Sequence, residues 1–150
     1  MKKFIISIDA GTTSNRSILF DLKGKPIFSS QKEFTQYFPK SGWVEHNPDE
    51  IWKTTIKTLK DVIQKAKRLK GKILSIGITN QRETTVLWDK KNGKPVYKAI
   101  VWQDRRTEEF CKKLRRKNKD TMVFNKTGLL IDSYFSGTKI KWILDNVPKA

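Results

Sequence analysis

Two polar segments of this sequence carry residues that could do chemistry, and the first follows the opening apolar run. Asp9 ends that run, and Gly11 permits a tight turn and a close backbone approach to a ligand. Hydroxyl groups and backbone N–H groups in such a turn can surround an anion, and a carboxylate beside them can hold Mg²⁺. The residues that would meet phosphate oxygens are Thr12, Thr13, Ser14 and Arg16. A plain hairpin built from turn-favouring residues explains the segment equally well.

The second polar segment places Arg82 and Glu83 between two apolar runs, Ile76–Ile78 and Val86–Leu87, which predict buried strands. A small polyol needs both a hydrogen-bond donor and an acceptor, which this pair supplies. Adjacent residues of a strand point to opposite faces, so both can reach one ligand only if the backbone turns there. Apolar walls for the ligand's carbon atoms could come from Trp102 and from Tyr134–Phe135. An exposed ion pair in a loop is the alternative.

The elements expected around the first segment are strands and one long helix. Strands over 3–9, 16–22 and 26–34 form a meander, which differs from the strand-then-helix opening of the Rossmann type. Asn47 is the predicted N-cap of a helix that starts at Pro48. Apolar residues then recur at helical spacing as far as Leu69, so one face is predicted to be buried.

Shorter elements are expected around the second segment. The run Asn92–Pro95 predicts a hairpin turn, and 96–102 predicts a strand. A helix is expected from about 104 to 117, and a last helix begins near Gly137.

Composition limits the class of protein. A chain of 150 residues can form one domain with a core, and it contains no apolar run of the roughly 20 residues that a membrane helix needs. The single cysteine, Cys111, fits a reducing compartment, so a cytoplasmic protein is expected.

The net charge of +17 raises the hypothesis of a nucleic-acid partner. Most of the excess is lysine spread along the chain, without interleaved aromatic residues in its densest run, which favours a solvated surface instead.

Four segments in order give the chain a family resemblance. They are 9–16 (DAGTTSNR), 42–48 (GWVEHNP), 76–107 and 134–146 (YFSGTKIKWILDN). With them the chain resembles the N-terminal part of the FGGY carbohydrate kinases, and within that family the kinases of glycerol. The resemblance implies an α/β fold of the actin-like, ribonuclease H-like type, with a mixed sheet that opens as an antiparallel meander and is flanked by helices.

The resemblance also implies an activity, the ATP-dependent phosphorylation of glycerol to sn-glycerol 3-phosphate. It assigns the nucleotide phosphates to Thr12, Thr13, Ser14 and Arg16, magnesium to Asp9, and the glycerol pocket to Arg82, Glu83, Trp102 and Tyr134. Ala10 and Ser133 depart from the residues usual at their positions, glutamine and proline, and neither is expected to carry chemistry.

Family members are much longer, so residues 1–150 are expected to be an incomplete N-terminal domain. A second actin-like domain would supply the aspartate that acts as general base, and no catalytic base is expected within 1–150. The chain alone is therefore expected to be inactive, and the full-length form to be a homo-oligomer without nucleic-acid or membrane partners. A non-catalytic binding module with the same fold, or a kinase of another small polyol or sugar, are the alternatives.

Overall fold

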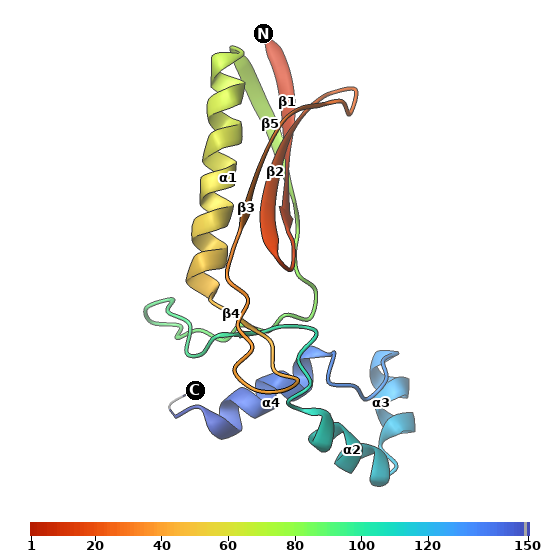
Figure 1. The fold of residues 1–150 in the computed structure, drawn as a ribbon. Coiled ribbons are helices and arrows are strands. Elements are labelled where there is room, and N and C mark those ends of the chain that lie inside the picture. Colours follow the sequence, from red (N-terminus) through yellow and green to blue (C-terminus); the bar gives the residue numbers. More distant parts are fainter. Residues whose placement is uncertain (149) are drawn as a thin grey trace. The chain divides into compact units, whose positions relative to one another are not determined.

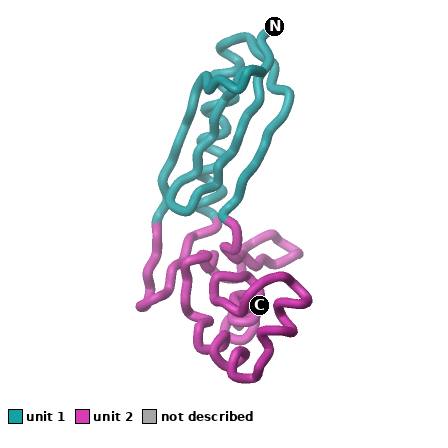
Figure 2. The backbone as a smooth tube through the Cα atoms, turned by 90° about the vertical axis from the view of Figure 1, so that its right-hand side faces the viewer, with its two compact units in different colours: residues 1–35, 49–81 teal, residues 36–48, 82–150 magenta. Residues whose placement is uncertain are grey.

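The computed structural model describes residues 1–148 and 150, which divide into two compact units. Unit 1 comprises 1–35 and 49–81, and unit 2 comprises 36–48 and 82–150 (Figure 2). No helix among the described residues combines the length and the apolar character needed to cross a membrane.

Unit 1 contains a four-stranded mixed sheet in the order β3-β2-β1-β5 (Figure 1). Its strands are β1 (Lys2–Ala10), β2 (Ser14–Asp21), β3 (Pro26–Glu33) and β5 (Gly71–Thr79). The first three form the antiparallel meander that the sequence predicts, and β5 pairs with β1 in parallel. Gly24, with φ 79°, makes the turn between β2 and β3.

Helix α1 (Pro48–Arg68) packs along this sheet and begins at the predicted residue. Its Val62 and Ala66 are buried against Phe4 and Ile6 of β1, which forms the core of unit 1. The predicted apolar face extends too far at its N-terminal end, because Trp52 is 65% exposed.

Strand β5 is not buried as its apolar sequence predicts. Ile73 packs against the core, but Ile76 is 45% exposed and Ile78 is 73% exposed. The reason is position: β5 is the edge strand, and no described element of unit 1 covers it beyond its first residues. Apolar composition shows that a strand can be buried, and the neighbouring elements decide whether it is.

Unit 2 has little sheet and three short helices. The elements are β4 (Glu45–His46), β6 (Ala99–Ile100), α2 (Glu108–Arg116), α3 (Asp120–Thr127) and α4 (Ser136–Asn146).

A buried cation lies at the centre of contacts within this unit: the Arg106 guanidinium lies 3.8 Å from the ring centre of Trp43 and 4.5 Å from that of Trp142. Burial alone would lower the pKa of Arg106, but hydrogen bonds to Asp104 and Glu45 outweigh it and raise that pKa.

Of two strands predicted in unit 2, one is absent and the other is shorter than predicted. Val86–Leu87 lies outside any strand, and the predicted strand 96–102 shortens to β6. Isolated bridges join Thr85 to Ile100 and Trp88 to Pro95 instead. At the second bridge the Asp89 amide donates to the Lys94 carbonyl (2.9 Å) and the Val96 amide donates to the Leu87 carbonyl (3.0 Å), so Pro95 occupies a position that needs no N–H. The turn predicted at Asn92–Pro95 is confirmed, with Gly93 at φ 70°.

The helix predicted over 104–117 is shorter at its start. The Asp104 carboxylate accepts a hydrogen bond from the Arg106 amide (2.8 Å), a local turn that competes with helix formation, so α2 begins only at Glu108. Helix α3 was not predicted, and it buries no residue that could produce a periodic apolar signal. Helix α4 begins at Ser136, close to the predicted Gly137.

Candidate functional site

The first candidate site is the hairpin between β1 and β2. Asp9 and Arg16 are directly opposite each other in the antiparallel register, with 3.3 Å between the guanidinium and the carboxylate. Their side chains are 42% and 46% exposed. Such an exposed pair is weak, so either partner can turn to a ligand at little cost.

Gly11 makes the hairpin tight. Its N–H donates to the Ser14 carbonyl at 3.0 Å, and a Cβ added at Gly11 would lie 2.8 Å from that same oxygen. Only glycine therefore fits without moving the backbone. The turn leaves Thr12 partly exposed and Thr13 exposed at its tip. The predicted hydroxyl-rich turn is thus presented at one end of unit 1.

Buried polar contacts attach this hairpin to α1. The Asn15 side-chain amide is fully buried and donates to the Ile51 carbonyl (2.9 Å) and to the Thr54 hydroxyl (2.7 Å). Next to it, the hydroxyls of Ser17 and Thr58 are 2.9 Å apart. Nothing in the local sequence predicts this attachment, which fixes where the hairpin lies on its unit.

The donor set of the hairpin is suited to magnesium bound together with phosphate. Asp9 supplies one carboxylate, and the described residues contain no cluster of three metal-ligating side chains. Nucleotide-bound Mg²⁺ requires only one or two protein carboxylates, because phosphate oxygens and water complete its coordination. The residues present therefore fit this ion.

In the second segment the backbone turns at Arg82 and Glu83. Such a turn is the condition under which both side chains can reach one ligand. Glu83 has φ 63°, a left-handed conformation that is uncommon outside glycine. Its Oε2 accepts hydrogen bonds from the amide (2.8 Å) and the hydroxyl (2.7 Å) of Ser136 at the start of α4. Arg82 is exposed and makes no ion pair within the described part of the chain, so the two residues are not each other's partners.

The aromatic residues of the predicted pocket contact one another. The rings of Trp102 and Tyr134 meet edge-on with 5.9 Å between their centres, and Phe135 packs edge-on against Tyr134 at 5.2 Å. A cavity of about 310 Å³ lies here, within the size range of small-molecule sites. Its lining residues are Trp102, Gln103, Arg105, Asp132 and Tyr134. Arg82 and Glu83 are not among them.

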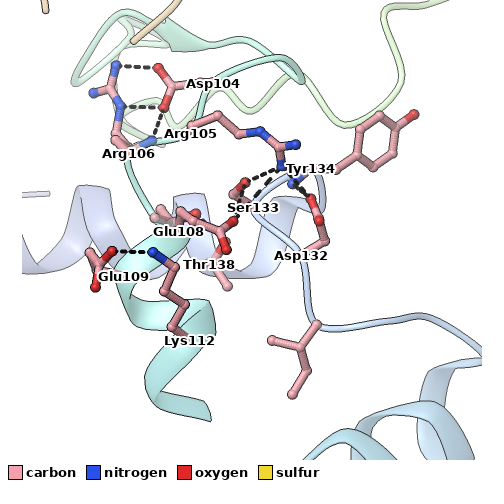
Figure 3. Close-up of polar contacts among 12 residues, drawn as sticks. Asp104, Arg105, Arg106, Glu108, Glu109, Lys112, Asp132, Ser133, Tyr134 and Thr138 are labelled. Atoms are coloured by element: carbon pink, nitrogen blue, oxygen red, sulfur yellow. Dashed lines mark hydrogen bonds and ion pairs between the residues drawn. The ribbon is translucent and has the colours of Figure 1, made fainter. Parts of the chain in front are cut away.

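A polar network holds Tyr134 in place (Figure 3). Arg105 Nη1 donates to Asp132 Oδ1 (3.0 Å) and to Ser133 Oγ (2.9 Å), and the same Asp132 oxygen accepts the Tyr134 amide (2.7 Å). The Ser133 hydroxyl also donates to Glu108 at 3.3 Å. Ser133 thus has a structural role in this network that a proline could not fill.

Three of the lining residues were not predicted: Gln103, Arg105 and Asp132. A usable signal existed: the polar run that contains Gln103 and Arg105 directly follows an apolar segment that ends at Trp102. Polar residues immediately after a buried strand often line a site. The hairpin residues belong to unit 1, and the Glu83 and Tyr134 group belongs to unit 2.

Comparisons with known proteins place these residues in a family context. The model of the FGGY family of carbohydrate kinases, N-terminal domain, matches residues 4–150. The chain is 59% identical to the glycerol kinases of Oceanobacillus iheyensis, over 149 residues and 99% of its length, and of Bacillus cereus, over all 150 residues. It spans 30% of the length of each of these relatives.

Solved structures agree on the fold. The chain superposes on Plasmodium falciparum glycerol kinase with ADP at a TM-score of 0.91 and 37% identity, over 98% of this chain and 29% of that one. A ligand-bound xylulose kinase from Lactobacillus acidophilus gives a TM-score of 0.88 at 24% identity, over 96% and 29% of the two chains. The actin-like α/β fold expected from the sequence is confirmed.

Proposed function

Because this chain belongs to the FGGY family of carbohydrate kinases, we propose that it is the N-terminal part of an ATP-dependent glycerol kinase. It would contribute the polyol site and the phosphate hairpin, and transfer of the phosphoryl group would yield sn-glycerol 3-phosphate. The proposal extends to residues beyond 150, because the chain spans less than a third of its relatives.

The polyol assignment rests on one observation: only one of the two oxygens of the Glu83 carboxylate accepts hydrogen bonds within the described residues. One oxygen is held by Ser136, while no donor among the described residues reaches the other oxygen, Oε1. A fixed carboxylate with one oxygen available is suited to accept a hydrogen bond from an alcohol. Arg82, next in the turn and exposed, would donate to a neighbouring hydroxyl. Trp102 and Tyr134 would contact the carbon atoms.

The hairpin would bind the nucleotide phosphates. Thr12, Thr13 and Ser14 would donate hydrogen bonds to phosphate oxygens, and Arg16 would leave Asp9 to meet the added negative charge. Asp9 would then hold the magnesium ion. That ion neutralises charge on the transferring phosphoryl group when it is bound.

The remaining parts of the active site would come from a second domain. We place there the aspartate that removes the proton from the glycerol hydroxyl, since the resemblance assigns no such base to residues 1–150. The full-length enzyme is proposed to be cytoplasmic and homo-oligomeric.

A hybrid enzyme tests the function. Residues 1–150 of this chain replace the matching residues of the Bacillus cereus relative, and glycerol-dependent formation of ADP is measured. We expect turnover by the hybrid and none by the 150-residue chain alone, because phosphoryl transfer requires groups from both sides of a closed site. A soluble, folded hybrid without turnover would contradict the proposal, and so would glycerol-dependent turnover by the chain alone.

A further inference from the structure

Lys139 on α4 is buried in an unusual way. Its side chain is fully buried, yet it forms no ion pair among the described residues. The ammonium group instead donates to two backbone carbonyl oxygens, that of Tyr134 and that of Glu83, the latter at 3.2 Å. Burying a charge without a direct ion pair is costly, and the location of such a group indicates what it serves.

Both carbonyls belong to residues of the proposed polyol site. Glu83 is therefore held at two points by α4: its carboxylate by Ser136 and its main chain by Lys139. Tyr134 is held at two points as well, its amide by Asp132 and its carbonyl by Lys139. Among these contacts, Lys139 is the one side chain that hydrogen-bonds to both Glu83 and Tyr134.

We propose that Lys139 is a positioning residue of the polyol site: it fixes the separation between the Glu83 carboxylate and the Tyr134 ring. The proposal rests on the proposed function. Glu83 needs this support because its left-handed backbone is intrinsically unfavourable and persists only where its surroundings enforce it. Without the lysine, we expect the turn at 82–83 to move away from the 132–134 turn, so that a small polyol can no longer contact both.

The protonation state of Lys139 gives the proposal a pH dependence. Burial lowers the pKa of Lys139 from 10.5 to about 8, and nearby titratable groups oppose this shift. Those groups are the carboxylates of Glu83, Asp104 and Asp132 and the thiol of Cys111. Below about pH 8 the group is a cation with three donors, and above it the neutral amine makes weaker hydrogen bonds to the same carbonyls. Glycerol binding should therefore weaken as the pH rises through this range.

The test compares Lys139→Met with Lys141→Met in the hybrid enzyme. Both changes remove one lysine from α4, but Lys141 is half-exposed and pairs with Asp145 at 2.8 Å. We expect Lys139→Met to raise the glycerol KM about tenfold or more, with kcat changed by less than about threefold, because misplacement acts on substrate binding. Between pH 7 and about 9.5 the glycerol KM should rise in the parent and in Lys141→Met, and stay flat in Lys139→Met.

The outcomes separate this proposal from the proposed function. A parent hybrid that phosphorylates glycerol, with the same glycerol KM and pH profile in Lys139→Met, overturns the positioning role alone. A melting temperature lowered without any change in glycerol KM means that the lysine is only structural, which also overturns it. A folded parent hybrid without turnover overturns the proposed function and this proposal with it.

Discussion

At the scale of single residues, Glu83 has a structural contact that the sequence did not suggest, beside the proposed role in polyol binding. One carboxylate oxygen stabilises the N-terminus of α4 through Ser136, and the other oxygen remains available for a ligand. Arg82 is not its structural partner, so the adjacent charges do not form the ion pair that local sequence also allowed. The contact with Ser136 holds the carboxylate in place, which supports the proposed role in polyol binding.

The substitution Glu83→Gln separates these two roles in the hybrid. A glutamine oxygen can still accept the Ser136 hydrogen bonds, while the second position becomes a donor. We expect the glycerol KM to rise about ten- to a hundredfold, because hydrogen bonds to charged groups contribute about 1.5–3 kcal/mol. Glu109→Gln is the matched control, since that residue is exposed and forms an ion pair with Lys112 far from the start of α4 in sequence. Unchanged glycerol kinetics with a lowered melting temperature would mean that Glu83 stabilises the start of α4 and does not bind glycerol.

At the scale of elements, the sequence was most informative where apolar periodicity and turn residues agree. The β1–β2–β3 meander and the start of α1 at Pro48 were predictable for that reason. Helix α3 was not, because it buries no residue, and the exposure of β5 was not, because covering elements are a tertiary property. Residue type and the family resemblance indicated candidate site residues on turns, whose roles remain predictions. Lys139 was not indicated, because nothing local distinguishes a buried lysine from the many exposed ones.

The β1–β2 hairpin gives a prediction at this scale. Gly11→Ala places a Cβ 2.8 Å from the Ser14 carbonyl, so the hairpin backbone must shift. We expect a higher ATP KM in the hybrid and a loss of about 1–3 kcal/mol in unfolding free energy. Gly77→Ala, also in unit 1, is the control, because an added Cβ there has no atom within 4 Å. Equal ATP kinetics in the two variants would mean that the tight turn is not needed for phosphate binding.

At the scale of the whole molecule, a strongly basic chain exposes apolar side chains on one edge strand. The net charge is +17, and β5 exposes Leu74, Ile76 and Ile78. Charge repulsion opposes self-association at low salt, and the exposed edge strand with its apolar side chains favours it. Which effect dominates depends on ionic strength.

We expect the 150-residue chain to be monomeric near 10 mM salt and to associate as salt rises, because the Debye length falls from about 30 Å to about 8 Å at 0.15 M. Light scattering across a salt titration measures this. Ile78→Ser should reduce the association, whereas Leu22→Ser, at an exposed position in the β2–β3 turn, should not. Scattering that stays flat for the parent chain would show that the exposed strand does not drive association.

The proposed function depends above all on where glycerol binds. A crystal structure of the hybrid with glycerol, cryoprotected without any polyol, measures this directly. We predict one glycerol hydroxyl within hydrogen-bond distance of Glu83 Oε1, a second near the Arg82 guanidinium, and the carbon chain against Trp102 and Tyr134. Glycerol bound in a position that contacts neither Glu83 nor Arg82 would contradict the account.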